Sequence, residues 1–295
     1  MAAPQAAIFS KDHAFHHHLE YRLTGAVADL LPAITEIRKA ARGDDRVVML
    51  IGFGAEVWRQ LDDAGAPAGL RSFEAVGPAD GAHAPATQND VWIWLQGPGP
   101  DVLLDAARRA DHYLRAIAER MVDLAGFSYR GNRDLIGFVD GTANPKDREA
   151  KEAAALIPGR GGAFAFTQKW LHDLDAFNAL AVGEQEAVVG RTKDDDIELE
   201  GDAMPADSHV SRTDASLDGV ALKIYRRSTP YGTVGEHGLF FVAFACDLMR
   251  VQVQLERMYG VAGDGLHDRL IDYSTAVTGS YWYVPDTAEL DGLFG

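Results

Sequence analysis

An apolar strand that runs directly into an amphipathic helix occurs once in each half of the chain, and this recurrence constrains the fold most. In the first half, residues 91–95 are rich in tryptophan and β-branched residues, which favours a strand, and residues 100–121 have helical spacing. In the second half, residues 239–245 predict a strand and residues 247–259 predict a helix. We interpret the recurrence as the duplication of an α+β unit.

The other periodic segments extend this alternation of strands and helices. The pattern predicts strands over 16–23, 46–51, 163–171 and 222–226, and helices over 26–42 and 174–189. Between the halves lies a long polar segment, residues 126–162, and long loops in compact proteins are often functional. We therefore divide the chain into an N-terminal half, residues 1–135, and a C-terminal half, residues 136–295.

Composition and charge narrow the class of protein. The chain has 295 residues, of which 47% are hydrophobic, and this balance excludes disorder. Its net charge of −16 repels phosphate backbones and anionic lipid, so we expect neither a nucleic-acid nor a membrane partner. The single cysteine, Cys246, excludes an intrachain disulfide, a cysteine-based zinc site and covalent c-type haem attachment. The N-terminus has no basic segment followed by an apolar stretch, which predicts a cytoplasmic protein.

Histidines and tryptophans are concentrated in the first-half strands. His16, His17 and His18 are consecutive, and neighbouring strand residues point to opposite faces, so the three cannot converge on one metal. We expect them to be half-exposed. Trp92 and Trp94 share one face of their strand, which favours packing in the core or at an interface.

Three polar residues in the second half are unusual for their settings. Asp140 follows two apolar residues and precedes a glycine, which permits close backbone approach to a ligand. His209 is a lone histidine in a polar segment, and Arg226 ends an apolar strand before a Pro- and Gly-containing turn. From the pattern alone, a turn-forming aspartate, a structural histidine and a surface arginine are alternative interpretations.

These residues lie in motifs that resemble those of the dye-decolourising peroxidases. Gly137-Phe138-Val139-Asp140-Gly141 resembles the family's GxxDG motif, and the similarity continues through residues 142–145. The order of aspartate, histidine and arginine is similar as well. Residues 222–226, followed by 229–232, also resemble a motif of the family, and the segment 270–279 resembles its C-terminal signature. Together these matches cover nearly the whole chain and resemble the compact bacterial B-type members. The fold that the resemblance implies is α+β, with two ferredoxin-like halves forming a dimeric α+β barrel-like fold and the haem site in the C-terminal half.

The resemblance implies one haem b per subunit, bound non-covalently. His209 would be the proximal iron ligand, because imidazole is the usual protein ligand in peroxidases. Asp272 would accept a hydrogen bond from the other ring nitrogen and raise the basicity of the imidazole. Arg191 would pair with a haem propionate.

On the distal face, the resemblance implies a carboxylate and an arginine. Asp140 would move a proton between the oxygens of hydrogen peroxide, and Arg226 would stabilise the charge that develops as the O–O bond breaks. Gly141 and Thr142 would line the haem beside Asp140.

The implied activity is that of a haem peroxidase. Hydrogen peroxide would oxidise the haem by two electrons, and small organic reductants such as dyes and phenols would return them one at a time. The alternatives are a deferrochelatase-like enzyme that releases iron from haem, and a non-enzymatic haem-binding protein. B-type relatives imply a homo-oligomer.

The chain departs from the family pattern at two places. Many B-type members have asparagine two positions after the distal arginine, where this chain has Ser228. Members packaged in encapsulin shells end in a tail that contains Gly, Ser and Leu. This chain ends at residues 289–295 directly after the signature strand, so we do not expect packaging.

Overall fold

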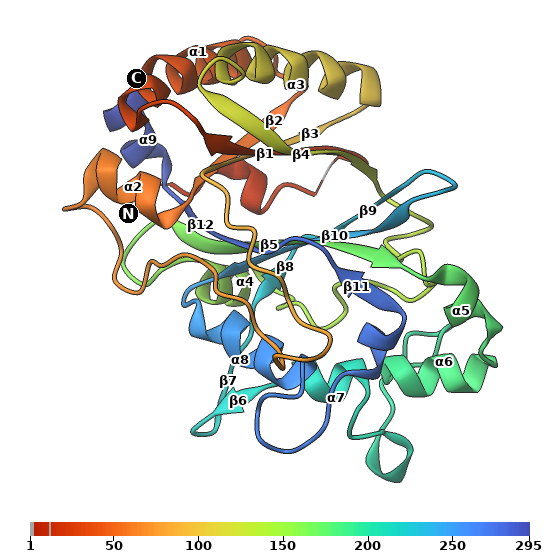
Figure 1. The fold of residues 1–295 in the computed structure, drawn as a ribbon. Helices are drawn as coiled ribbons and strands as arrows, with labels where there is room; N and C mark the ends of the chain where they lie inside the picture. The colour runs from red at the N-terminus through yellow and green to blue at the C-terminus, as the bar shows by residue number, and fades with distance from the viewer. Residues whose placement is uncertain (1–2, 12) are drawn as a thin grey trace.

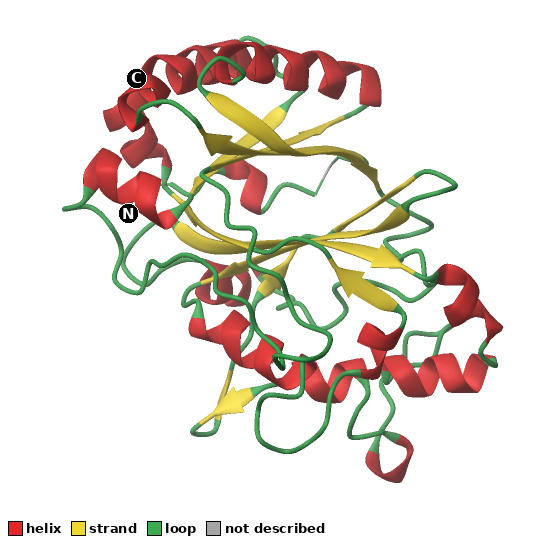
Figure 2. Ribbon diagram, in the orientation of Figure 1, coloured by secondary structure: helices red, strands yellow, loops and turns green. Residues whose placement is uncertain are grey.

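The centre of the protein is an antiparallel sheet that closes on itself (Figures 1 and 2). The computed structural model of the chain describes residues 3–11 and 13–295. Around the closed sheet, neighbouring strands follow in the order β5 (Ala163–His172), β12 (Ser280–Val284), β2 (Val48–Phe53), β3 (Val91–Gly97), β1 (Phe15–Leu23), β4 (Ala118–Phe127), β9 (Thr229–Gly232) and β10 (His237–Ala245). Strand β10 then pairs with β5, which completes the barrel. The short strands β11 (Ser274–Ala276) and β8 (Tyr225–Arg226) extend it beside β5 and β10.

Helices cover the barrel in two groups (Figure 1). Over the first-half strands lie α1 (Leu30–Arg42) and α3 (Pro100–Leu114), with α2 (Ala55–Asp62) and α9 (Thr287–Phe294) beside them. On the far side, below β5 and β10, lie α4 (Arg148–Ala155), α5 (Leu174–Ala179), α6 (Val182–Val189), α7 (His209–Thr213) and α8 (Met249–Met258). The short elements are the 3₁₀ turns η1 (Ala6–Ile8), η2 (Val27–Asp29), η3 (Gly201–Ala203) and η4 (Arg269–Asp272), and the hairpin β6 (Ser216–Leu217) with β7 (Val220–Ala221). Within the described residues, no helix is long and apolar enough to cross a membrane.

Two faces of the sheet are buried. Trp92, Trp94, Trp282, Phe240 and Phe244 fill the inside of the barrel and belong to one buried cluster. The outer face of the first-half strands packs against the apolar sides of α1 and α3. Because strand residues alternate between faces, β5 and β10 also present one row of side chains inward and another toward the second helical group. This second row forms part of a cavity.

The predicted α+β class with a barrel-like sheet is confirmed. Both strand-to-helix units are present, as β3 with α3 and β10 with α8. The helix predicted over 100–121 is too long, because it ends at Leu114 and β4 begins at Ala118. Strand β4 pairs with β1 along its whole length, and this tertiary pairing outweighs the local helical spacing.

Three further expectations need correction. The helix predicted over 174–189 is divided into α5 and α6 by an extended backbone at Leu180 and Ala181. Of the strand predicted over 222–226, only Tyr225 and Arg226 pair with β10. The three histidines are buried rather than half-exposed, although they do alternate between faces: His17 meets Asp123 at 2.7 Å, while His16 and His18 stack with Trp94.

Candidate active site

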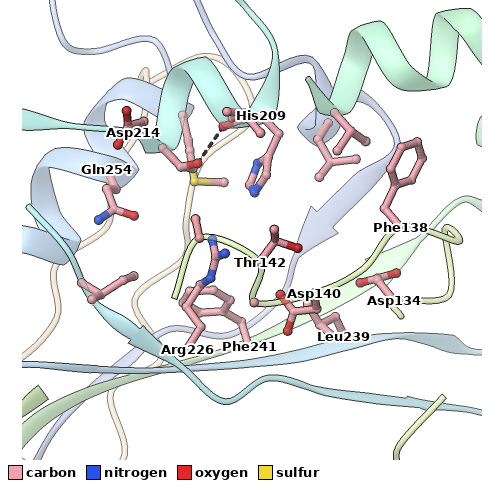
Figure 3. Close-up of a pocket in the computed structure, with 18 of the residues that line it drawn as sticks. Asp134, Phe138, Asp140, Thr142, His209, Asp214, Arg226, Leu239, Phe241 and Gln254 are labelled. Atoms are coloured by element: carbon pink, nitrogen blue, oxygen red, sulfur yellow. Dashed lines mark hydrogen bonds between the residues drawn. The ribbon is translucent and has the colours of Figure 1, made fainter. Parts of the chain in front are cut away.

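A cavity of about 240 Å³ lies between the outer face of β5 and β10 and the helices α7 and α8 (Figure 3). Its walls are mainly apolar and include Phe166, Trp170, Leu239, Phe241, Leu255 and Met258. A single buried water needs only about 10–15 Å³, so the cavity has room for a much larger ligand. The predicted residues His209, Asp140 and Arg226 all line it. His209 points into the cavity from one side, and Asp140 and Arg226 lie on the opposite side (Figure 3).

His209 is fixed at the first residue of α7. The preceding Ser208 caps the helix by accepting a hydrogen bond from the backbone N–H of Ser211. The Nδ1 atom of His209 lies 2.6 Å from Oδ2 of Asp268, whose side chain has no exposed surface. With Nδ1 donating its proton to this carboxylate, the Nε2 lone pair is left free to bind a metal in the cavity.

The carboxylate beside His209 is therefore Asp268, and the assignment of Asp272 is wrong. Asp272 instead lies 3.0 Å from Nε2 of His267, and both of those side chains are about half exposed. The 3₁₀ turn η4 separates the two aspartates, because Asp268 caps its start and Asp272 ends it. The sequence contains two aspartates four residues apart. Only their positions in η4 distinguish them, because Asp268 caps its first residue and Asp272 is its last.

Asp140 is held by its backbone in the loop between β4 and α4. Its N–H donates to the carbonyl of Asn132 at 2.9 Å, and Nδ2 of Asn132 donates to the carbonyl of Asp140 at 2.8 Å. Gly141 follows with a φ of +75°, a conformation that disfavours any side chain. Burial raises the pKa of the Asp140 carboxyl above its ordinary value, and the positive charge of Arg226 partly offsets this rise.

Asn144 connects the Asp140 loop to the strand that carries Arg226. Its Oδ1 accepts a hydrogen bond from the backbone N–H of Arg226 at 2.8 Å, and its Nδ2 donates to the carbonyl of the same residue at 2.9 Å. One amide thus fixes the backbone of Arg226 from both sides. Sequence reasoning missed this role, although Asn144 stands in the quoted motif.

The Asn144 contacts predict the effect of removing this amide. Asn144→Ala leaves two backbone groups of Arg226 without partners, which costs about 1–3 kcal/mol for each group that stays buried. We expect a lower midpoint in urea-induced unfolding. An unchanged unfolding midpoint would show that the amide does not hold the strand.

Arg191 and Thr142 also line the cavity. Arg191 forms ion pairs with Glu198 and with Asp196, and its guanidinium also donates to the Asp196 carbonyl at 2.9 Å. Thr142 donates to the Asp196 carboxylate at 2.6 Å. The Arg191 guanidinium is thus already paired with two acidic residues of its own loop. Ser228 is absent from the cavity wall, and its hydroxyl is buried without a partner in the described part of the chain.

A second histidine on the wall was missed. His172, the last residue of β5, lies 2.8 Å from Oγ of Ser274 through Nδ1 and 3.3 Å from Asp134 through Nε2. Both ring nitrogens of His172 are thus occupied, in contrast to His209. Its position at the end of an apolar strand was the one available signal, because its two partners lie far away in the sequence.

The comparisons with known proteins agree with this geometry. The family model described as Dyp-type peroxidase, N-terminal, matches residues 7–128, and the model described as Dyp-type peroxidase, C-terminal, matches residues 131–289. A dye-decolorizing peroxidase of Mycolicibacterium paratuberculosis is 37% identical over 254 residues, which cover 83% of this chain and 71% of the relative. One from Brevibacterium linens is 34% identical over 273 residues, covering 90% and 74%.

Solved structures extend the similarity to the whole fold. DyPB of Rhodococcus jostii superimposes with a TM-score of 0.91 at 32% identity and covers 99% of both chains. Variants of that protein have been solved in complex with haem. A dye-decolorizing protein of Vibrio cholerae has a TM-score of 0.86 at 33% identity, covering 97% of this chain and 98% of the other. Both halves of this chain match the family, and so does the barrel they form together, so the protein is a member of the Dyp-type peroxidase family.

Proposed function

We propose that this protein binds haem b in the cavity and uses hydrogen peroxide to oxidise small organic substrates, such as dyes and phenols, in one-electron steps. The observation that carries the proposal is the opposed pair of polar groups across one apolar cavity. His209 with Asp268 lies on one side, and Asp140 with Arg226 lies on the other.

The residues of the cavity fit haem. Among the described residues, no group of three or more His, Cys, Asp or Glu side chains is arranged to hold a metal ion. A single imidazole with a free Nε2 suits a metal that arrives with most of its ligands already bound, as the iron of haem would. The aromatic and aliphatic walls suit a flat apolar macrocycle, and Arg191 in the lining suits a carboxylate substituent.

When bound, the haem supplies an iron centre that can take up the two oxidising equivalents of hydrogen peroxide. Asp140, when ionised, accepts a proton from one oxygen of hydrogen peroxide and returns it to the other, which leaves as water. The guanidinium of Arg226 stabilises negative charge on the departing oxygen. Asp268 keeps Nδ1 of His209 protonated and the ring in one orientation.

Neither alternative function accounts for the carboxylate of Asp140 and the guanidinium of Arg226 opposite His209. A haem carrier needs His209 and the apolar walls, but it has no use for a carboxylate and a guanidinium on the far side. An iron-releasing enzyme would have to protonate the macrocycle rather than peroxide. The deciding assay supplies the haem-loaded protein with hydrogen peroxide and a phenol, and in parallel with a reductant and an iron chelator. Phenol oxidation without iron release supports the peroxidase, and the reverse result would contradict it.

The remaining parts of the proposal concern context. We propose a B-type member in which residues 136–295 carry the haem and residues 1–135 complete the barrel. A cytoplasmic location, a homo-oligomeric state and the absence of encapsulin packaging stay predictions.

The pKa of Asp140 leads to a prediction for the pH dependence. A carboxylate base stays ionised at lower pH than an imidazole, so dye turnover is expected to be greatest in mildly acidic solution. Burial raises the pKa of Asp140, so activity should decline on the acid side at a higher pH than for a free aspartate. Arg226→Leu removes the charge that offsets this rise, and the acid limb should then move further up. Steady-state rates across the pH range check both statements, and an alkaline optimum would contradict Asp140 as the base.

The correction at His209 can be tested with two matched substitutions. Asp268→Asn keeps the shape of the side chain but loses the charge beside Nδ1, and loss of such a partner typically costs about 10–100-fold in activity or metal affinity. Asp272→Asn, in the same segment but on the surface, should leave both unchanged. Haem titration and the rate of reaction with peroxide measure the effects. If the Asp272 variant were the impaired one, the arrangement of η4 described here would be wrong.

A further inference from the structure

The inside of the barrel contains a row of three indoles, here called the indole stack, that the proposed reaction does not use. Trp282, Trp92 and Trp94 have no exposed surface, and successive ring centroids are 6.0 Å apart. The planes of Trp92 and Trp94 differ by 11°, whereas Trp282 is tilted by 33° to Trp92. The imidazole of His18 stacks on both Trp92 and Trp94. Indoles are among the most easily oxidised side chains, and neighbouring rings at this distance can pass an electron from one to the next.

One of these indoles is connected to a buried base. Nε1 of Trp282 donates to Oγ1 of Thr167 at 2.8 Å, and the Thr167 hydroxyl donates to Oε1 of Glu20 at 2.7 Å. None of the three side chains reaches solvent. The hydroxyl therefore stands between a proton donor and a carboxylate, in the geometry needed to pass a proton along.

Glu20 is a carboxylate without a cation. Its second oxygen accepts from Nδ2 of Asn89 at 2.8 Å, Ser280 lies nearby, and no ion pair to Glu20 occurs in the described ranges. The residues opposite Glu20 on β3 and β4 are Trp92 and Val122. Two positions away on its own strand are His18, whose pKa burial lowers, and the exposed Arg22, whose guanidinium contacts Asn89 rather than Glu20. Burial raises the pKa of Glu20 to about 7, so it gains a proton more readily than an exposed glutamate does.

The other two indoles lack such a path. Trp92 Nε1 is buried with no acceptor in the described residues. Trp94 Nε1 donates to Nδ1 of His16 at 3.2 Å, but burial, with Arg227, lowers the pKa of His16 to about 3. The Arg227 guanidinium also lies 5.2 Å from the centre of the Trp94 ring and opposes positive charge there. If one of the three indoles loses an electron, the oxidised state is therefore most stable on Trp282.

The hydrogen-bonded chain of Trp282, Thr167 and Glu20 lies on the inner face of the sheet whose outer face lines the cavity. Thr167 is flanked on β5 by Phe166 and Gln168, and both line the cavity on the outer face of the sheet. In the same way, Phe240 packs on His18 inside the barrel, while Phe241 lines the cavity. The stack is thus shielded from solvent and is adjacent to the place where peroxide is reduced.

We propose that Trp282, Thr167 and Glu20 form a proton-coupled redox site that stores one of the two oxidising equivalents delivered by hydrogen peroxide. Trp282 loses one electron to the oxidised cavity site. Its Nε1 proton passes to Thr167, and the Thr167 hydroxyl proton passes to Glu20. The products are a neutral indolyl radical and a neutral carboxylic acid, so the step removes a buried charge instead of creating one. One electron from an organic reductant, with the proton returning from Glu20, restores the site. This inference rests on the proposed peroxidase function.

The test is electron paramagnetic resonance of the haem-loaded protein, frozen shortly after mixing with one equivalent of peroxide and no reductant. A radical is expected whose hyperfine splitting changes when the tryptophans are ring-deuterated. The ionised fraction of a group with a pKa of about 7 is roughly 0.9 at pH 8 and 0.1 at pH 6, so the radical yield should fall nearly tenfold between them.

Three variants locate the radical. Glu20→Gln, which keeps the size of the side chain, should lose the pH dependence and most of the signal, and Trp282→Phe should lose the tryptophan signal. Trp94→Phe is the matched control and should retain the radical. If Glu20→Gln kept both the yield and the pH dependence, or if deuteration left the wild-type spectrum unchanged, the proposal would be overturned. A Soret band that does not respond to peroxide would instead contradict the peroxidase function itself.

Discussion

His209→Ala is expected to lose haem binding. His209 is the cavity histidine whose Nε2 is free, because Asp268 occupies its Nδ1 while Ser274 and Asp134 occupy both nitrogens of His172. Loss of the ligand itself should exceed the roughly 10–100-fold effect of losing a partner behind a ligand. Haem titration followed at the Soret band measures the affinity.

A nearby histidine provides the control for this prediction. His267 lies beside Asp268 in the sequence but is half exposed and pairs with Asp272. His267→Ala should therefore bind haem as the wild type does. A His209 variant that purified with full haem and an unchanged Soret band would exclude His209 as the ligand.

Arg226→Leu is expected to slow the reaction with hydrogen peroxide more than Asp140→Asn does. Removing a group that stabilises developing negative charge costs on the order of 10²–10³ in rate, and general base catalysis is worth roughly 10²–10⁴. These two ranges of rate loss overlap, so the residues around Asp140 and Arg226 determine which variant is slower. Asp134 also lines the cavity and raises the pKa of Asp140 through its charge, so the same cavity contains a second carboxylate that can accept a proton when Asp140 is replaced. Among the described residues that line the cavity, the other guanidinium is that of Arg191, and it is already paired with Glu198 and Asp196.

Stopped-flow absorbance at one pH ranks the two variants, with equal haem content as the condition for comparison. The pH profiles give an independent readout. The acid limb should move to higher pH in the Arg226 variant, and in the Asp140 variant it should no longer reflect the raised pKa of Asp140. A larger loss of rate in the Asp140 variant would make the carboxylate the main catalyst in this protein.

The sequence predicts those features of the molecule that local chemistry decides. Strands with strong apolar character, such as β3 and β10, lie where periodicity places them, and the motif around Asp140 forms the loop that enters the cavity. Features that depend on partners far away in the chain were missed. Strand β4 exists because β1 pairs with it, and the amide of Asn144 acts on a residue 82 positions away.

The same distinction explains the error at Asp272 and the buried histidines. Which aspartate meets His209 depends on a hydrogen bond between segments 59 residues apart, and η4 places Asp268 at its buried start and Asp272 at its exposed end. The histidines of β1 resemble surface residues in sequence, yet barrel closure encloses His16 and His18 among indoles. Closure itself requires β10 to pair with β5, and strand periodicity carries no information on that pairing.

The central claim is that the cavity holds haem between His209 and the Asp140–Arg226 pair and directs its reaction with peroxide. The most direct measurement is the visible spectrum of the haem-loaded protein before and after one equivalent of hydrogen peroxide, followed by addition of a phenol. We predict a rapid change of the Soret band that the phenol reverses in two one-electron steps, with all iron retained. A spectrum that peroxide leaves unchanged, or one that decays with loss of iron, would contradict the account.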